Sequence, residues 1–217
     1  MTTPWIAAAS TLGIIAAYEG WLAVAHRRAP QGLVATEHAA LREDWFAAIS
    51  AQPGSEILAV QTLRNALMSA TMTASTAVLG LMGALSLTAP HMPAALAEAA
   101  GVAASTSSHA GARLAMELVL LGLLFAALVA SVMAVRYYNH AGFIGGMPVG
   151  APQRARWADA GTAYVRRAGA LYSWGLRQLL LVVPVVAYLL HPAAGVAGAA
   201  GVVAVLVQFD RSIVARR

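Results

Sequence analysis

Residues 113–136 have the sequence RLAMELVLLGLLFAALVASVMAVR, an apolar run with an arginine at each end. A helix needs roughly 20 apolar residues to cross the hydrocarbon of a bilayer, so this run predicts a transmembrane helix. Four further hydrophobic runs occur at about 4–25, 58–88, 171–190 and 193–209. We therefore expect an all-α fold, a polytopic membrane helix bundle with about five transmembrane helices, in which residues 1–217 form a single transmembrane domain.

The composition supports a membrane protein and excludes several kinds of reaction chemistry. Hydrophobic residues make up 59% of the 217 residues and charged residues 11%, with a mean hydropathy of +0.68, whereas soluble domains are about a quarter charged. All 14 basic residues are arginines, and the sequence contains neither lysine nor cysteine. These two absences exclude Schiff-base chemistry on lysine, thiolate chemistry, disulfides and iron–sulfur clusters.

The distribution of arginines predicts the orientation. Arginines occur in 26–57, in 137–170 and in the C-terminal tail, while 1–3 and 89–112 contain none. By the positive-inside rule, the N-terminus is outside and the C-terminus is cytoplasmic. Because no basic residue precedes the first span, we expect an uncleaved N-out anchor rather than a signal peptide. We expect a multi-pass protein of the bacterial inner (cytoplasmic) membrane.

The last two hydrophobic runs are separated only by His191-Pro192. We predict a tight helical hairpin over 171–209; a single bent or re-entrant element is the structural alternative. The final run carries three glycines at intervals of three residues: Gly195, Gly198 and Gly201. This spacing predicts close contact with another helix.

The segments between the spans also have helical patterns. Residues 33–49 place apolar side chains at helical spacing, which predicts an amphipathic helix that packs on the bundle. Residues 154–171 predict a cytoplasmic extension of the fourth span, with the arginines mostly off its packed side. Glycines and prolines from 142 to 152 predict a loop before that helix. We expect the outer segment 89–112 to be a mobile loop.

Polar residues inside the spans are the candidate site. The segment Gln61-Thr62-Leu63-Arg64-Asn65 places a guanidinium and two amides in a membrane helix, where a charge is rare and usually functional. Glu19 and Arg177 also lie about six residues from the inner ends of their spans, so all three charges sit roughly 9 Å below the same boundary. Residues at matched depths with opposite charges should pair, and we expect the pairs Glu19–Arg64 and Arg177–Asp210.

This inner layer has two interpretations. It is either a structural network that fixes helix register, or a net positive layer that attracts an anion or a phosphate-bearing ligand. The count of charges favours the anion modestly, since three arginines face two carboxylates. The expected ligand- or ion-binding residues are Gln61, Arg64, Asn65, Arg136, Asn139 and Arg177. Their charge partners are Glu19 and Asp210.

The second span divides into two faces. Small residues follow one another at three- and four-residue steps: Thr62, Ala66, Ser69, Thr73, Thr76, Gly80 and Gly83. Such a face predicts helix packing, either within one chain or in a homo-oligomer. The adjoining face carries Gln61, Arg64, Asn65, Met68, Met72 and Ser75 and is suited to line a polar cavity.

Few other residues of the sequence are candidates for metal binding, haem binding or catalysis. His91, His109 and His191 match no metal-ligand spacing, and haem ligation by His26 and His140 is a minor alternative. We expect no metal and no cofactor. No nucleophile and base can be assembled, so we expect no catalytic residue, although inner-layer carboxylates could exchange protons, Glu19 above all.

Several residues of this chain form a pattern similar to that of a known family. They are Tyr18, Trp21, Trp45, the segment from Gln61 to Asn65 followed by Met68, then Arg136, Asn139 and Asp210. In this pattern the chain resembles the membrane family of unknown function numbered five hundred and ninety-nine, found in bacteria and land plants. The chain departs from plant members at His140. The resemblance implies a membrane protein that shares the second-span motif, and it implies no mechanism.

Two classes of function follow from the residues. The first is an oligomeric channel or transporter for small anions, with membrane lipids, further copies of the chain and a small anion as its partners. The alternatives are a non-transporting scaffold or accessory subunit of a membrane complex, and a binder of lipid head groups. The net charge of +5 reflects topology-determining arginines, so we expect no nucleic-acid partner.

Overall fold

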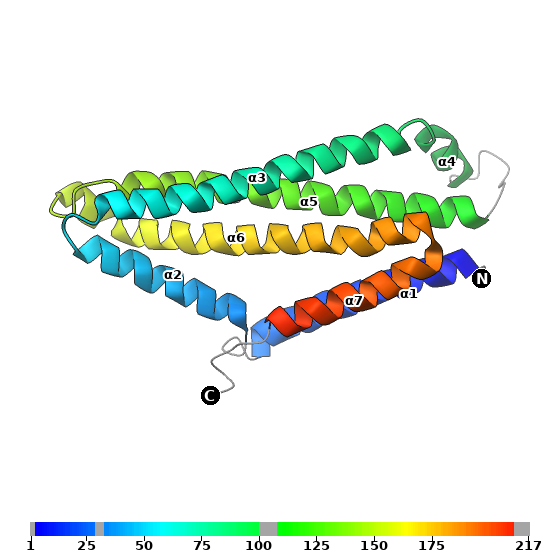
Figure 1. Cartoon of the computed structure of the whole chain (residues 1–217), viewed down its shortest axis with the longest axis horizontal. Coiled ribbons are helices and arrows are strands. Elements are labelled where there is room, and N and C mark those ends of the chain that lie inside the picture. The colour runs from blue at the N-terminus through cyan, green and yellow to red at the C-terminus, as the bar shows by residue number, and fades with distance from the viewer. Residues whose placement is uncertain (1–2, 29–32, 100–107, 211–217) are drawn as a thin grey trace. The chain divides into compact units, whose positions relative to one another are not determined.

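The computed structural model describes residues 3–28, 33–99 and 108–210, which are almost entirely helical (Figure 1). Within these ranges the chain forms seven helices: α1 (Thr3–Arg28), α2 (Val34–Ala51), α3 (Glu56–Thr88), α4 (Met92–Ala99), α5 (Ser108–Gly145), α6 (Pro152–Leu190) and α7 (Pro192–Asp210). Five of the described helices, α1, α3, α5, α6 and α7, are long and apolar enough to cross a membrane. The predicted all-α class with five spans is confirmed.

Two helices lie outside the predicted spans. α2 corresponds to the amphipathic helix expected over 33–49. α4 corrects the expectation of a loop over 89–112, because Met92–Ala99 is helical. Its alanines and leucine favour a helix. Residues 100–107 of that segment lie outside the described residues.

The other bounds differ from prediction mainly at α5 and α6. α5 continues past Arg136 to Gly145, so the breaker-rich loop covers only 146–151. A glycine inside a helix costs about 1 kcal/mol, and buried neighbours such as Ala141 and Ile144 supply packing that offsets this cost. α6 runs unbroken from Pro152 to Leu190, which confirms that 154–171 extends the fourth span.

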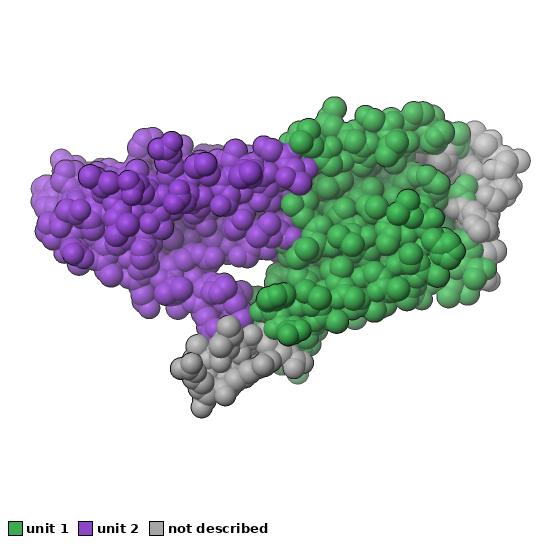
Figure 2. Space-filling model, viewed as in Figure 1, with its two compact units in different colours: residues 1–30, 77–126, 177–211 green, residues 31–76, 127–176, 212–217 purple. Residues whose placement is uncertain are grey.

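The chain divides into two compact units, shown in different colours in Figure 2. The first unit comprises residues 1–30, 77–126 and 177–211, and the second comprises residues 31–76, 127–176 and 212–217. α1, α4 and α7 belong to the first unit and α2 to the second, while α3, α5 and α6 contribute a segment to each.

In the first unit, α6 and α7 form a hairpin that packs against α1. A Cβ atom built on Gly195 would lie 2.5 Å from Cβ of Tyr188 and 3.0 Å from Oγ1 of Thr11. One built on Gly198 would lie 3.3 Å from Cα of Pro184. The predicted hairpin and the close glycine contacts are confirmed at these two positions, whereas Gly201 faces open space.

In the second unit, α2 packs on the bundle through Phe46, which is 1% exposed. Phe46 belongs to a cluster of buried apolar residues that also contains Leu63, Ala70, Ala134, Tyr138, Ala141, Ile144, Val165 and Ala168. Gly161 on α6 makes room for the Phe46 ring, because a Cβ there would lie 2.5 Å from the ring. The prediction that the 33–49 helix packs on the bundle is therefore confirmed.

Within the chain, the packing face of α3 overlaps the expected small face only in part: Thr73 is buried and a Cβ on Gly80 would lie 3.0 Å from Cδ2 of Leu124. The buried residues along this helix are Ala59, Leu63, Ala70, Thr73, Ala77, Ala84 and Thr88. Thr62, Ser69 and Thr76 of the predicted small face are exposed, and a Cβ on Gly83 would meet nothing within 4 Å. The hydroxyls of Ser69 and Thr76 bond carbonyls four residues earlier in the same helix, so they need no neighbouring helix. Alanines make up most of the buried positions of α3, and the exposed small residues stay predicted as packing positions only for a homo-oligomer.

Candidate functional site

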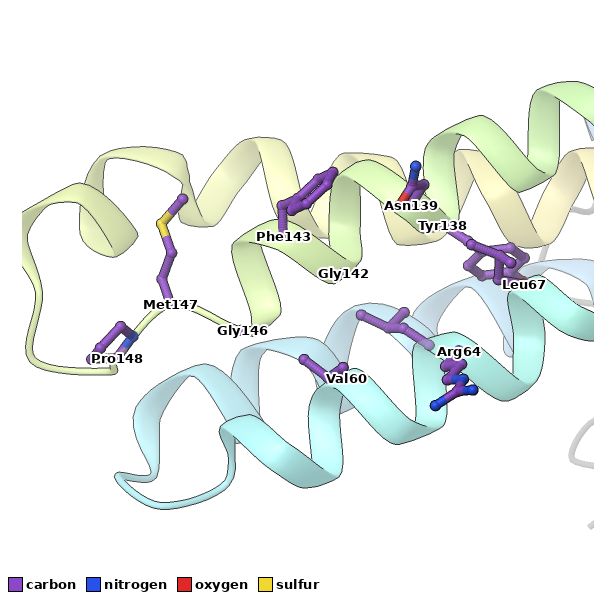
Figure 3. Close-up of a pocket in the computed structure, with 11 residues that line it drawn as sticks. Val60, Arg64, Leu67, Tyr138, Asn139, Gly142, Phe143, Gly146, Met147 and Pro148 are labelled. Atoms are coloured by element: carbon purple, nitrogen blue, oxygen red, sulfur yellow. The ribbon is translucent and has the colours of Figure 1, made fainter.

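A cavity of about 650 Å³ lies in the second unit, between α3, α5 and the segment that follows α5 (Figure 3). Its lining residues are Val60, Leu63, Arg64, Leu67, Tyr138, Asn139, Gly142, Phe143, Gly146, Met147 and Pro148. On α3 these residues recur at steps of three and four, the spacing of one helical face. Most of the wall is apolar, and among the described residues that line it Arg64 is the only charged one.

Arg64 and Asn139 were both predicted as ligand-binding residues, and they line this same cavity from two helices. Both side chains are exposed. Within the described ranges, the Arg64 guanidinium forms no ion pair and no hydrogen bond. A guanidinium carries five N–H donors and a permanent positive charge, so Arg64 is available to bind an anion.

Three other predicted residues do not line the cavity. Gln61 and Asn65 are exposed on α3, and Arg136 is exposed on α5. Gln61 and Asn65 each follow a lining residue by one position, which turns them about 100° around the helix axis. Their role as ligand-binding residues stays a prediction.

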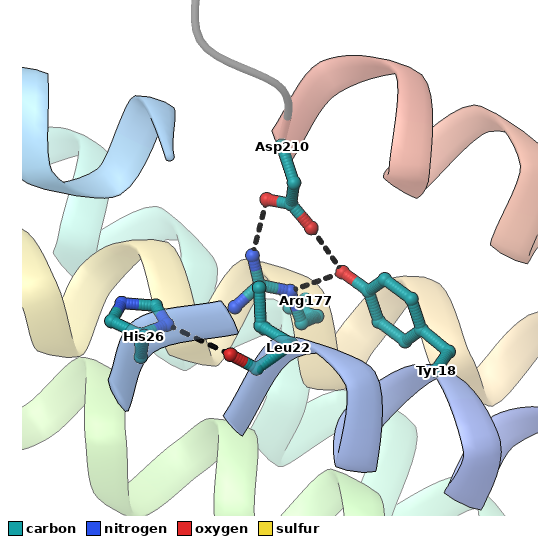
Figure 4. Close-up of polar contacts among 5 residues, drawn as sticks. All are labelled: Tyr18, Leu22, His26, Arg177 and Asp210. Carbon is teal, nitrogen blue, oxygen red and sulfur yellow. Dashed lines mark hydrogen bonds and ion pairs between the residues drawn. The ribbon is translucent and has the colours of Figure 1, made fainter. Parts of the chain in front are cut away.

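Arg177, the sixth predicted residue, lies in a polar cluster of the first unit (Figure 4). Its Nη2 atom is 2.6 Å from Oδ1 of Asp210, so the predicted ion pair between α6 and α7 is present. Its Nε atom donates to Oη of Tyr18 at 2.8 Å, and Tyr18 donates to Asp210 Oδ2. Arg177 is therefore occupied by two partners from α1 and α7.

Glu19 follows Tyr18 along α1. Its Oε1 atom is buried and has no hydrogen-bond partner among the described residues. The carboxyl group of Glu19 interacts electrostatically with the charged side chains of Arg177 and Asp210. The expected pair of Glu19 with Arg64 would join residues of different units, and it stays a prediction.

Arg154 is a residue whose role the sequence pattern did not reveal. It was expected to lie off the packed side of its helix, but it is 2% exposed. Its Nη1 atom donates to the carbonyls of Ile144, Gly145 and Met147 at 2.6–3.2 Å, and its Nη2 atom donates to Ser50 Oγ at 3.1 Å. The last carbonyls of a helix lack partners within that helix, so burial of Arg154 satisfies the end of α5.

A second contact holds the same segment. Glu56, the first residue of α3, accepts a hydrogen bond from the backbone N–H of Val149 at 2.9 Å. Arg154 and Glu56 thus fix both sides of Met147 and Pro148, which form one end of the cavity wall. In the sequence, these contacts were indicated only by the glycines near 145 and 146, which favour the end of a helix, where backbone carbonyls need donors.

Tyr18 was also missed as a functional group. It was noted only as a residue shared with a family, yet its hydroxyl lies between Arg177 and Asp210 and its side chain is 3% exposed. A buried tyrosine hydroxyl needs a hydrogen-bond partner. No spacing along the sequence links residue 18 to residues 177 and 210.

The sequence matches the family described as "Protein of unknown function, DUF599" over residues 6–215. The chain belongs to the DUF599 family. No curated protein and no solved structure matches it.

Membership of DUF599 confirms the family resemblance and brings no activity with it. The five apolar helices show the architecture of a multi-pass membrane protein. Among the described residues, no three His, Asp or Glu side chains are grouped so that they could hold a metal ion. Any function must therefore be argued from the cavity at Arg64 and from the cluster at Arg177.

Proposed function

We propose that this chain is a multi-pass protein of the cell inner membrane that binds an anionic, amphiphilic ligand in the cavity at Arg64. The observation that supports the proposal most is an arginine without partners among the described residues, on the wall of a largely apolar cavity of about 650 Å³. The chemistry that fits is a phosphate head group with an apolar tail or glycerol portion.

The two kinds of lining residue have separate roles in this proposal. Arg64 binds the phosphate through charge-assisted hydrogen bonds, which are stronger than neutral ones. Asn139 adds an amide that can donate to a phosphate or glycerol oxygen. Apolar residues such as Leu67 and Phe143 contact the hydrocarbon part of the ligand. Basic pockets between helices on the cytoplasmic side bind phosphate head groups in other membrane proteins.

A binding measurement tests this proposal. The full chain is purified in detergent, and retention of phosphatidylglycerol, phosphatidylcholine and inorganic phosphate is compared by native mass spectrometry. We expect phosphatidylglycerol to bind most tightly, and Arg64→Ala to weaken it roughly tenfold or more, since a hydrogen bond to a charged group contributes about 1.5–3 kcal/mol.

The matched control is Arg136→Ala, which removes an exposed arginine that does not line the cavity. This control should leave binding unchanged. Equal losses in both variants would indicate unspecific attraction of anionic lipid and would contradict the proposal. Tighter retention of inorganic phosphate than of the lipid would favour a small-anion site.

The function expected from the sequence, an oligomeric channel or transporter for small anions, is the second candidate. The exposed Gln61, Arg64 and Asn65 on one stretch of α3 support it, because a polar helix surface within a span is expensive in lipid and would be covered in a homo-oligomer. Anion flux in liposomes, changed in rate or selectivity by Arg64→Ala, would support this function. Absence of flux for any common anion would contradict it.

A scaffold or accessory subunit is the alternative that involves no ligand. It predicts a stoichiometric membrane partner in pull-downs from native membranes. Under that function, Arg64→Ala would leave lipid retention unchanged.

A further inference from the structure

The first unit contains a carboxyl group, that of Glu19, which has no part in the proposed ligand cavity. Glu19 lies in α1, within a helix apolar enough to span a membrane. Its Oε1 atom is shielded from solvent and accepts no hydrogen bond from any described residue. The side chain as a whole is half-buried, but shielding even one oxygen of an ionised carboxylate without a hydrogen-bond partner is costly, and uptake of a proton removes this cost.

The neighbouring cation does not remove this cost, because it is already engaged. Arg177 binds Asp210 through Nη2 at 2.6 Å and Tyr18 through Nε at 2.8 Å. Asp210 in turn accepts a hydrogen bond from Tyr18. The Arg177–Asp210 pair is therefore neutral as a whole, and an ionised Glu19 would add one uncompensated negative charge beside it.

Two charged groups from other helices interact electrostatically with Glu19: Arg177 from α6 and Asp210 from α7. Tyr18, which precedes Glu19 on α1, is hydrogen-bonded to both of them. Of the two carboxyl groups, Asp210 has the guanidinium and the phenol as donors, while Glu19 Oε1 has none among the described residues. The proton should therefore reside on Glu19 and not on Asp210.

We propose that Glu19 is a proton-binding site within the membrane bundle, protonated at neutral pH and able to exchange its proton with water, while Arg177 stays paired with Asp210. On release, the O–H bond of the carboxylic acid breaks and the proton passes to water or hydroxide. The carboxylate that remains adds negative charge next to Arg177, where it competes with Asp210 for the guanidinium. Proton binding at Glu19 thereby favours the contact between α6 and α7.

Infrared spectroscopy of the full chain in lipid nanodiscs tests the protonation state directly. The wild type should show the C=O stretch of a protonated carboxylic acid at neutral pH, and this band should shift in D2O and disappear on alkaline titration. Glu19→Gln should remove the band. Glu117→Gln should retain it, because Glu117 is a spanning-helix carboxylate that pairs with Arg113 at 2.9 Å.

Two further variants keep the test decisive. Glu19→Asp retains a carboxyl group and should shift the band without abolishing it, which serves if Glu19→Gln does not fold. Asp210→Asn leaves Glu19 as the carboxyl group beside Arg177, so Glu19 should ionise and the band should weaken or disappear in this variant. Absence of the band in the wild type would overturn the proposal. That absence is expected if Glu19 forms an ion pair with Arg64, because Glu19 would then be ionised. The proposal is equally overturned by a band that survives Glu19→Gln and is lost in Asp210→Asn.

Discussion

Nη2 of Arg177 lies 2.6 Å from Oδ1 of Asp210, which joins α6 to the last residue of α7. The two side chains are 13% and 14% exposed, so the ion pair is largely shielded from water. It closes the hairpin at the end opposite to the turn at His191. Tyr18 ties α1 into the same contact.

Removal of one partner of this ion pair should destabilise the first unit. Asp210→Asn removes the carboxylate to which Arg177 is hydrogen-bonded, and breaking a buried pair in this way costs about 3–5 kcal/mol. Some remaining exposure reduces the expected loss to about 2–3 kcal/mol. Thermal unfolding in detergent, followed by circular dichroism, measures the change.

The control for this prediction is Arg166→Ala. Arg166 pairs with Glu43 at 3.3 Å, and the two side chains are 54% and 34% exposed; pairs with exposed partners contribute about 0–1 kcal/mol. If both variants lowered the unfolding temperature equally, the Arg177–Asp210 pair would have no special structural role.

Gly195→Ala should loosen the contacts of α7. The added Cβ would lie 2.5 Å from Cβ of Tyr188, so helix α7 must shift, and overpacking of this kind costs about 1–3 kcal/mol. Gly201→Ala on the same helix meets open space and should be neutral or slightly stabilising, because alanine favours helix over glycine. Equal unfolding temperatures of the two variants would contradict the close packing of the hairpin.

Arg154→Met should release the segment that ends the cavity wall. The substitution leaves the carbonyls of Ile144, Gly145 and Met147 without their donor, and an unsatisfied buried polar group costs about 1–3 kcal/mol. Hydrogen exchange in residues 146–149 should accelerate. Arg156→Ala, at an exposed position two residues later, should leave exchange unchanged; acceleration in both variants would indicate unspecific fraying of the start of α6.

Depth within a span was enough to predict part of the candidate site. Arg177 and Asp210 were expected to pair because both were assigned to the inner ends of the last two spans, which the turn at His191-Pro192 places side by side in an antiparallel hairpin. Arg64 and Asn139 meet at one cavity for a similar reason, since both lie near the inner ends of their predicted spans. Hydropathy likewise predicted the five long helices.

Contacts that depend on side-chain direction could not be predicted in the same way. The small residues of α3 include serines and threonines whose hydroxyls bond their own helix, so small size alone did not identify the packing face. Arg154 has the same sequence context as the other arginines between residues 152 and 167, and only the fold brings it against the end of α5. Tyr18 meets Arg177 from 159 positions away along the chain.

The claim that Arg64 and its cavity bind an anionic lipid is tested most directly by photo-crosslinking. A phosphatidylglycerol with a photoreactive group near its glycerol is incorporated with the full chain into nanodiscs, and labelled peptides are mapped by mass spectrometry. Labelling should concentrate in residues 138–148, fall several-fold in Arg64→Ala and persist in Arg136→Ala. Labelling spread evenly over the spans, or labelling of 138–148 that is insensitive to Arg64→Ala, would contradict the claim.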